Sequence, residues 1–356
     1  MTGQRTITIG LIGAGMVGQL AHLANFTGLS GCRVAALAEL RPDLAQAAAT
    51  RFGVPKIYPS HRELLEDREI EAVVVVTRRP ATGPIVLDAL SSGRHVLSEK
   101  PMAHTVAQGE KLVEAAELAG LTYAVGFMKR HDAGVQQAKL LLDEARADGR
   151  WGRLLTVRCH CHGGDFAAGA QLEGGHVMTP EPRPDGLELW PVAPDWLPAS
   201  LDEDYAWFLN VFVHDLNILR WLFGAMPEVV AADLRRRNGR TVLLDFGDFP
   251  AVLDMAETSG PDWSEGVEAT FERATLRIAF PPPLLRNVPA SITLRHAGTT
   301  TTIHPPPDGW SWSFRRQAEA FVADIRERLT PLAGCRDGLE DLRLAEAIWR
   351  LSGSLR

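Results

Sequence analysis

In the first third of the chain, apolar residues fall into short runs separated by stretches with helical periodicity. The runs cover residues 7–12, 34–38, 72–76, 95–98 and 122–125. The third run is a nearly continuous string of valines, as expected of a strand covered on both faces of its sheet. Strands that alternate with helices predict a doubly wound parallel sheet, so we expect an α/β fold class for this part of the chain.

The pattern changes after Gly126. Strand-like runs now follow one another across turns rather than across helices, at residues 154–162, 228–235, 242–246, 252–257, 267–271, 276–280 and 292–296. This succession predicts a large, mostly antiparallel open sheet. We therefore expect an N-terminal domain at residues 1–126 and a C-terminal α+β domain at residues 127–356. Helical stretches at 314–328 and 339–351 end the chain, and the last is expected to pack back on the first domain.

Length and charge narrow the class of protein. The chain has 356 residues, and domains typically span about 100–200 residues, which supports two domains. With 44 acidic against 37 basic side chains, a net charge of −7 and no block rich in lysine and arginine, nucleic acid is not expected as a partner. No apolar run approaches the roughly 20 residues that cross a bilayer, and the scattered cysteines suit a reducing compartment. We expect a soluble cytoplasmic protein without a membrane partner.

A glycine-rich motif joins the first strand to the helical stretch after it: Gly13, Ala14, Gly15, Met16, Val17 and Gly18. In the pattern G-x-G-x-x-G the first glycine makes a tight turn, the second lets the backbone touch a pyrophosphate, and the third lets helix and strand pack closely. The phosphates then lie at the helix N-terminus, which favours negative charge. The alternative is a glycine-rich turn that binds nothing, but the intact strand and helix around the motif favour a dinucleotide site.

Glu39 ends the second strand, where an acidic side chain binds the adenosine ribose hydroxyls of NAD and repels the 2′-phosphate of NADP. Arg41 follows two residues later and can neutralise a 2′-phosphate if Glu39 turns away. We therefore predict NAD as the cofactor and keep NADP as the alternative.

Glu99, Lys100 and Pro101 follow the strand at residues 95–98. Ligands of doubly wound sheets bind at the carboxyl ends of the strands. A lysine there can hydrogen-bond a substrate hydroxyl and shift its proton, with its pKa depressed by burial and by a positive nicotinamide. Taken alone, a lysine at a strand end is more often a solvated charge.

A polar stripe follows a helix expected from residue 207 to residue 222. Asn210, His214 and Asn217 lie at positions i, i+4 and i+7 and so share one face of a helix that is otherwise apolar. Buried polar groups need partners, and a hydroxylated substrate would supply them. Histidine is the natural proton acceptor near neutral pH, although a lone histidine is as often a core or surface residue.

Two further segments have competing interpretations. Residues 163–206 read as a long loop. Trp190 and Trp196 of this loop, with Trp207 directly after it, can line a sugar pocket or cover a sheet or subunit interface. Residues 159–162 read Cys-His-Cys-His, but alternation in a strand turns the cysteines to one face and the histidines to the other. Their spacing also differs from that of structural zinc sites, so no metal is predicted.

The residues resemble the family of glucose-fructose oxidoreductase, inositol dehydrogenase and the rhizopine catabolism protein (Gfo/Idh/MocA). The resemblance covers most of the chain. It rests on the glycine motif with Glu39 and on these runs: Ala89–Leu90, Gly93–Val96, Glu99–Pro101, Gly126–Arg130, and His214 followed by residues 219–224. It implies an N-terminal Rossmann domain, a homodimer or homotetramer formed through the C-terminal sheet, chemistry on a sugar or cyclitol hydroxyl, and Lys100 with His214 as the catalytic pair.

The sequence departs from the family pattern at two places. Many members carry aspartate where Asn210 stands, and an amide can orient a hydroxyl but cannot take its proton. The usual Thr-Pro-x-x-x-His run reads Thr77-Arg78-Arg79-Pro80 followed by Ala81 and Thr82. Arg78 and Arg79 can meet a phosphate or carboxylate on the substrate, or form a solvated basic turn.

The expected activity is hydride transfer between a nicotinamide cofactor and a secondary hydroxyl or ketone of a sugar, sugar derivative or cyclitol. Substrate contacts are expected from Asn210, Asn217, Lys129, Arg130 and Trp190. Cofactor contacts beyond the glycine motif are expected from Glu39, Arg41, Thr77, Arg78, Glu99 and Lys100. Redox-neutral elimination or epimerisation with retained NAD, and a non-catalytic dinucleotide-binding sensor, are the alternatives.

Overall fold

The computed structural model describes residues 5–170, 174–182, 184–306 and 311–353. The chain divides into two compact units, which we describe separately. The first unit comprises Met1–Phe127, Ala170–Ala199 and Phe314–Leu342. The second comprises Met128–Gly169, Ser200–Ser313 and Arg343–Arg356.

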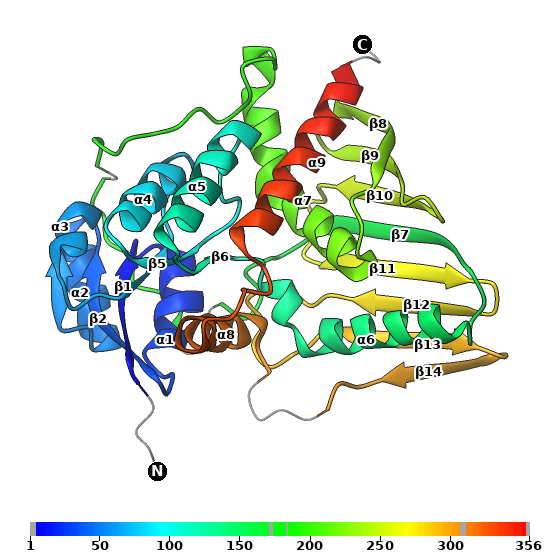
Figure 1. Ribbon diagram of the computed structural model, residues 1–356, viewed down its shortest axis with the longest axis horizontal. Coiled ribbons are helices and arrows are strands. Elements are labelled where there is room, and N and C mark those ends of the chain that lie inside the picture. The colour runs from blue at the N-terminus through cyan, green and yellow to red at the C-terminus, as the bar shows by residue number, and fades with distance from the viewer. Residues whose placement is uncertain (1–4, 171–173, 183, 307–310, 354–356) are drawn as a thin grey trace. The chain divides into compact units, whose positions relative to one another are not determined.

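The first unit is built on a six-stranded parallel sheet with strand order β3-β2-β1-β4-β5-β6. Its strands are β1 (Ile7–Ile12), β2 (Cys32–Ala38), β3 (Lys56–Tyr58), β4 (Ala72–Val75), β5 (His95–Ser98) and β6 (Tyr123–Val125). The central strands β1 and β4 are buried at every position, because helices cover both faces of the sheet (Figure 1). The strand order reverses between β1 and β4, which is where doubly wound sheets bind ligands.

The helices of this unit begin and end at recognisable caps. They are α2 (Pro42–Phe52), α3 (His61–Glu66), α4 (Arg79–Ser91) and α5 (Val106–Ala119), besides the short segments that follow β1. The Ser60 and Thr105 side chains accept backbone N–H groups in the first turns of α3 and α5. Gly53 and Gly120, with φ of 67° and 63°, end α2 and α5 in the left-handed conformation that favours glycine.

Helix α8 (Ser313–Glu327) completes the core of the first unit from the far end of the chain. Ala318, Phe321, Val322 and Ile325 of this helix join the apolar cluster formed by β1, β2 and α2. The first part of the last helix, α9 (Cys335–Gly353), also belongs to the first unit, and its remainder belongs to the second. The chain thus returns to the first unit after building most of the second.

The second unit contains an eight-stranded sheet with strand order β14-β13-β12-β11-β7-β10-β9-β8. The strands are β7 (Leu154–Gly163), β8 (Glu228–Arg236), β9 (Gly239–Asp245), β10 (Pro250–Ala256), β11 (Ser264–Phe271), β12 (Ala274–Ala279), β13 (Ser291–His296) and β14 (Thr299–Ile303). Among the described strands of this sheet, β7 and β10 alone pair in parallel. Helices α6 (Ala133–Asp148) and α7 (Asp202–Phe223) pack on this sheet (Figure 1). The expected fold class, a doubly wound parallel sheet with a mostly antiparallel sheet after it, is confirmed.

The alternation predicted for residues 159–162 is also present. Cys159 and Cys161 of β7 are buried with 0% and 2% of their surface exposed, whereas His160 and His162 lie on the opposite, half-exposed face.

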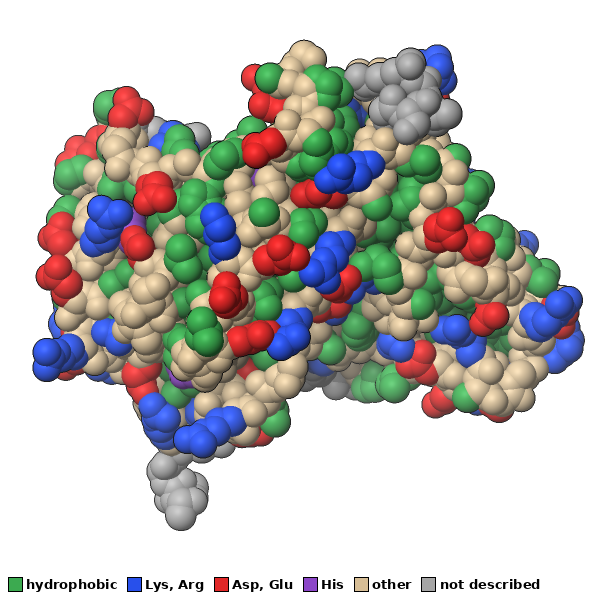
Figure 2. All heavy atoms as spheres, turned by 45° about the horizontal axis from the view of Figure 1, so that its top comes forward, with side chains coloured by type: hydrophobic (Ala, Val, Ile, Leu, Met, Phe, Trp, Pro, Cys, Tyr) green, Lys and Arg blue, Asp and Glu red, His purple; other side chains and the backbone are tan. Residues whose placement is uncertain are grey.

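Charges of both signs are interspersed on the face of the molecule drawn in Figure 2, and neither sign gathers into one large patch. Within the described residues, no helix has the length and apolarity that a membrane span requires.

Candidate active site

The turn after β1 has the geometry that a dinucleotide-binding glycine motif requires. Gly13 has φ of 98°, and a Cβ placed on it would lie 2.2 Å from the carbonyl oxygen of Val76. A Cβ on Gly18 would lie 2.4 Å from the carbonyl oxygen of Gly13. A Cβ on Gly15 would meet no described atom within 4 Å, so the backbone there is open to an approaching group. The residues therefore fit a bound pyrophosphate.

The helix that follows the glycine turn begins at Met16, contains a π-helical stretch, η1 (Gly18–Leu23), and continues as α1 (Ala24–Phe26). Single π-turns inside helices occur frequently at functional sites. The buried Gln19 side chain donates to the carbonyl oxygen of Ala14 at 2.7 Å. It also donates to the carbonyl oxygen of Val177 at 3.0 Å and accepts the Val177 N–H at 2.8 Å. Gln19 thereby joins the glycine turn to a distant segment.

Glu39 lies at the end of β2 beside the glycine turn. One carboxylate oxygen accepts the Ala14 N–H at 2.9 Å. The other accepts the backbone N–H and the Nε of Arg41, and Arg41 Nη2 reaches the first oxygen at 3.2 Å. Arg41 is thus held in a two-pronged ion pair with Glu39 rather than directed at a free 2′-phosphate position. Glu39 is 7% exposed, and its two carboxylate oxygens accept four N–H groups of the chain, so a ribose hydroxyl would take the place of one of the Arg41 contacts.

Lys100 is the second residue after the carboxyl end of β5, where the sequence predicted it, and is partly exposed. Its backbone N–H donates to Glu99 Oε2 at 3.3 Å, and the Lys100–Pro101 peptide bond is cis. Glu99 Oε1 lies 2.8 Å from His22 Nε2. Burial alone would raise the pKa of Glu99, but the His22 hydrogen bond and the charges of His22 and Lys100 outweigh it and lower that pKa.

His22 is a residue that the sequence interpretation missed. It lies on η1, is 2% exposed, and stacks edge-on against Phe314 of α8 with ring centroids 5.9 Å apart. The sequence feature that could have pointed to His22 is a histidine one helical turn after the glycine motif. Only the fold shows that its partner is Glu99.

The run after β4 behaves in part as a basic surface turn. Arg78 and Arg79 are exposed, and Arg79 begins α4. Partial desolvation lowers the pKa of Arg79, while the charge of Glu99 opposes this shift. The Thr77 hydroxyl lies 3.3 Å from the Thr82 hydroxyl. His104 is buried, and this burial together with the charge of Arg79 lowers its pKa to about 4.

In the second unit, the predicted polar stripe lies on α7. Asn210 and His214 are partly exposed, whereas Asn217 is buried. The Asn217 side-chain oxygen accepts Arg130 Nε at 2.7 Å, and its carbonyl oxygen accepts Arg130 Nη2 at 3.2 Å. Two residues expected to bind substrate therefore bind each other, which supplies the partner that a buried polar group needs.

Lys129 belongs to a buried charged cluster beside the same helix. Its ammonium group pairs with Glu265 of β11. Asp215 lies nearby, and burial first and the Glu265 charge second raise its pKa to about 8. Burial would lower the pKa of Lys129, but the carboxylates raise it above its ordinary value. Because its pKa lies above neutrality, Asp215 is mostly protonated at neutral pH, beside the ion pair of Lys129 with Glu265.

One atom each from Cys161, Asp215 and Glu265 lies within 4.8 Å of the others, a spacing compatible with metal ligation. The sequence interpretation, which considered the cysteines only with their neighbouring histidines, did not find this group. Asp215, the only acid inside the buried part of an apolar helix, was the available signal. Glu265 gave none.

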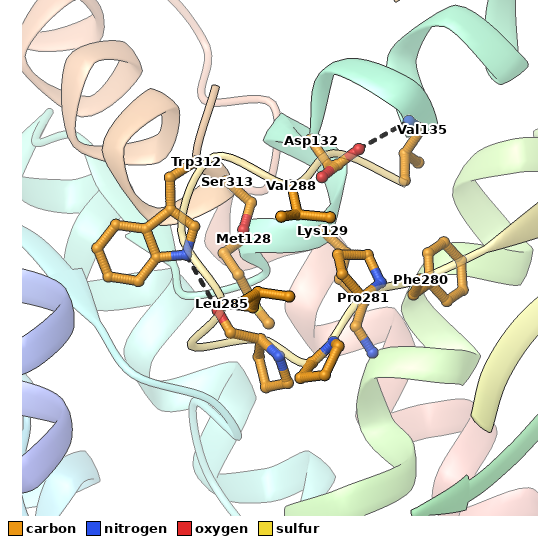
Figure 3. A pocket seen from close by; sticks show the side chains of 12 residues that line it. Met128, Lys129, Asp132, Val135, Phe280, Pro281, Leu285, Val288, Trp312 and Ser313 are labelled. Carbon is orange, nitrogen blue, oxygen red and sulfur yellow. Dashed lines mark hydrogen bonds between the residues drawn. The ribbon is translucent and has the colours of Figure 1, made fainter. Parts of the chain in front are cut away.

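A small pocket of the second unit opens beside Lys129 (Figure 3). The Lys129 ammonium lies 5.3 Å from the centroid of the Phe280 ring, and the Trp312 indole N–H donates to the carbonyl oxygen of Pro283 at 3.0 Å. Asp132 fixes the start of α6 by accepting the N–H groups of Gly134 and Val135. The pocket therefore combines an aromatic wall with a buried cation.

Trp190 belongs to the first unit. Its backbone N–H donates to the carbonyl oxygen of Pro80 at 2.8 Å, and its ring covers Gly83, where a Cβ would lie 2.3 Å from the indole. Trp207 belongs to the second unit, where the Arg237 guanidinium lies 5.3 Å from its ring centroid.

A model of a protein family described as an oxidoreductase family with an NAD-binding Rossmann fold matches residues 7–127. Among curated relatives, an inositol 2-dehydrogenase of Acidothermus cellulolyticus is 27% identical over 299 residues, covering 81% of this chain and 77% of the relative. An inositol 2-dehydrogenase of Burkholderia multivorans is 30% identical over 262 residues. That match covers 72% of this chain and 65% of the relative, so it spans just under two thirds of the relative's length.

Solved structures share the fold over nearly the whole chain. An aldose-aldose oxidoreductase from Caulobacter crescentus, complexed with glycerol, is 20% identical with a TM-score of 0.75 and covers 99% of both chains. A 3-ketoreductase from Actinomadura kijaniata in complex with NADP and TDP-benzene is 21% identical with a TM-score of 0.75, over 98% of both chains. An apo scyllo-inositol dehydrogenase from Lactobacillus casei is 21% identical with a TM-score of 0.72, over 99% of this chain and 97% of the other.

Proposed function

Since this chain belongs to the Gfo/Idh/MocA family of oxidoreductases, we propose that it transfers a hydride between a nicotinamide cofactor and a secondary hydroxyl or ketone of a sugar, sugar derivative or cyclitol. The observation that carries the proposal is the glycine turn. A Cβ on its first or third glycine would meet the backbone of the chain, while its second is open, and Ala14 between the first two donates its N–H to Glu39.

The backbone from Gly13 to Gly18 would hold the pyrophosphate and Glu39 the adenosine ribose. When bound, the nicotinamide ring supplies the hydride-accepting carbon. The protein contributes position, proton transfer and electrostatics. Thr77, Arg78, Glu99 and Lys100, at the carboxyl ends of β4 and β5, are proposed to face the nicotinamide half of the cofactor.

Lys100 and His214 are proposed as the catalytic pair, as the family resemblance implies. In the oxidative direction His214 accepts the hydroxyl proton with help from Lys100, whose ammonium group stabilises the growing negative charge on the substrate oxygen. Hydroxyl oxidation needs this proton acceptor because hydride departure makes the oxygen acidic. Asn210, on the same helix face as His214, can orient a neighbouring hydroxyl by hydrogen bonding.

Lys129, Arg130, Asn217 and Trp190 are proposed to act on the substrate mainly by shaping its surroundings. Arg130 and Asn217 bind each other, and Trp190 is fixed on α4, so each presents a preorganised surface. Lys129 contributes the cation in the pocket of Figure 3.

The proposed assembly is a homodimer or homotetramer formed through the eight-stranded sheet. Its outer face carries Leu243 of β9 beside Val252 of β10, two partly exposed apolar residues directly opposite each other in the register. Apolar surface of this kind favours association when a second sheet covers it.

The direct test is binding of NADH and NADPH to the purified protein by fluorescence, followed by a screen of sugars, sugar nucleotides and inositols for absorbance by reduced nicotinamide. NADH formation with one substrate class supports the proposal and names the substrate. Tight binding without net NADH, across substrates in both directions, would shift the assignment to redox-neutral chemistry. Failure to bind either dinucleotide would overturn it.

A further inference from the structure

A segment inserted between β7 and α7 fastens onto the first unit along the dinucleotide-binding side. Residues 174–182 and 184–199 of this inserted segment have almost no regular structure and form the green trace in Figure 1. Val177 exchanges hydrogen bonds with Gln19, the residue next to Gly18, and packs against the apolar core of the first unit. At its other end the Pro191 carbonyl accepts Gln108 Nε2 at 2.9 Å. The segment is thus anchored at several places along its length.

Glu181 is the charged anchor of this segment. One of its carboxylate oxygens accepts the Asp43 N–H at 3.1 Å and the other accepts the Leu44 N–H at 3.0 Å. These donors are free N–H groups at the start of α2, an eleven-residue helix whose own N-cap residue, Arg41, supplies no side-chain cap. The Thr179 hydroxyl also donates to Glu181, at 2.9 Å. A carboxylate from 138 residues away therefore occupies the anion position of this helix.

The same helix start adjoins the residues that read the cofactor ribose. The Arg41 guanidinium forms an ion pair with Glu39, and its positive charge also helps to lower the pKa of Glu181. The positive charge of Arg41 thus acts on two carboxylates, and the three side chains together carry a net charge of about −1. The pKa of Glu181 is lowered because its hydrogen bonds with Asp43, Leu44 and Thr179 and the charge of Arg41 outweigh its desolvation, so Glu181 is ionised at neutral pH.

A 2′-phosphate on the adenosine ribose needs an arginine or free N–H groups near the end of the second strand. This protein has both, Arg41 and the start of α2, and both are already bound by carboxylates. We infer that Glu181 is a specificity-determining residue that, together with Glu39, selects NAD over NADP. Glu39 repels the 2′-phosphate at the end of β2, and Glu181 occupies the N–H groups at the start of α2 that would otherwise bind it.

This inference rests on the proposed function only in requiring that the chain bind a nicotinamide dinucleotide. The test is fluorescence titration of wild type, Glu181→Gln and Glu181→Ala with NADH and NADPH. Removing one negative charge near a dianionic phosphate should tighten NADPH binding by about tenfold. NADH binding should change by less than about threefold, because NADH has an uncharged hydroxyl in place of that phosphate. Exposed Glu188 lies on the same segment, so Glu188→Gln is the matched control and should change neither affinity.

Ionic strength gives a second readout. If the selectivity is electrostatic, the difference between wild type and Glu181→Gln should shrink as salt is raised from about 0.05 M to about 0.5 M, where screening is stronger. The melting temperatures of wild type and variants, measured in parallel, report whether the loss of the Glu181 hydrogen bonds to the start of α2 destabilises the protein.

Failure of the role inferred for Glu181 can be distinguished from failure of the proposed function. An unchanged NADPH to NADH affinity ratio overturns the inference, as does equal weakening of both ligands with a lower melting temperature, which would make Glu181 only a structural cap. Wild-type protein that binds neither dinucleotide would overturn the cofactor assignment as a whole. A wild-type protein that binds NADH, with variants of unaltered selectivity, leaves the proposed function intact and rejects only the role of Glu181.

Discussion

At the scale of single residues, position along a strand matters as much as residue type. Lys100 would be an ordinary solvated lysine elsewhere. Here it directly follows Glu99, the residue at the end of β5 whose carboxylate is bound by His22. Because His22, Glu99 and Lys100 are linked in this order, the lysine has a defined backbone position from which to act.

Replacing Lys100 by Met should leave NADH affinity nearly unchanged while turnover falls by about 10²–10⁴, the range typical of lost acid–base help. Methionine is also unbranched and only one atom shorter than lysine, and it lacks the charge and the hydrogen-bond donors. Steady-state kinetics on the substrate identified by the screen, with NADH titration alongside, measures both quantities. A Lys100→Met enzyme with wild-type turnover would remove Lys100 from the mechanism.

Asp215 should make the protein less stable as the pH rises. Its pKa is raised to about 8 in the folded state from its ordinary value of 3.8, so between these limits the folded state binds a proton that the unfolded state has lost. The free energy of unfolding contributed by this group therefore falls from about pH 4 to about pH 8 and is constant above that.

Asp215→Asn mimics the protonated acid and should flatten this dependence. Melting temperatures from pH 5 to pH 8.5 should decline less in the variant than in wild type, with the difference between the two curves largest at the alkaline end. Asp248→Asn, at an exposed turn of the same unit, is the control and should run parallel to wild type. Parallel curves for Asp215→Asn would show that Asp215 is ionised at neutral pH.

At the scale of elements, different glycines of the glycine turn are needed for different reasons: Gly13 for the stability of the fold and Gly15 for binding of the cofactor. Gly13→Ala places a Cβ against the Val76 carbonyl in a left-handed conformation and should cost more than about 1 kcal/mol of stability. Gly15→Ala meets no described atom of the chain. Its melting temperature should stay within about a degree or two of wild type, while NADH affinity falls roughly tenfold or more because the methyl group occupies the pyrophosphate approach. Loss of stability without loss of binding in Gly15→Ala would contradict this division.

The last helix secures α7, which carries His214. Trp349 of α9 is 1% exposed and meets Tyr205 and Phe208 of α7 edge-on, with ring centroids 5.5 and 5.9 Å apart. Trp349→Ala should lower the free energy of unfolding by about 3–5 kcal/mol, measured by chemical denaturation. Leu140→Ala on α6, which is 57% exposed, should change it by less than about 0.5 kcal/mol. Equal effects would show that the ring cluster does not stabilise the unit.

At the scale of the whole molecule, the open sheet determines the expected assembly. If its outer face forms the subunit interface, Val252→Arg with Leu243→Glu should convert the assembly to monomers in light scattering coupled to size-exclusion chromatography. Both positions alternate with buried neighbours, so the exchange should leave the fold of the unit intact by circular dichroism. An unaltered oligomer would place the interface elsewhere.

Much of the fold follows from local periodicity. Most strands and the two C-terminal helices were predicted to within a few residues because burial on one or both faces leaves a clear alternation. The strands that were missed lack this contrast. Strand β3 has three residues with none fully buried, and β14 reads Thr-Thr-Thr-Thr-Ile with four exposed positions. Their pairing with β2 and β13 comes from the neighbouring strand rather than from their own sequence.

The sequence by itself determined the glycine turn, the acidic residue at the end of β2, the lysine after β5 and the polar stripe of α7, because each depends on residues close together in the chain. The tertiary structure decided their partners. Asn217 binds Arg130, Lys129 pairs with Glu265, Glu99 with His22, and Glu181 caps α2 from 138 residues away. The sequence shows that buried charges and unpaired backbone groups at helix ends need partners. Which residue becomes the partner depends on which distant segments the fold brings next to them.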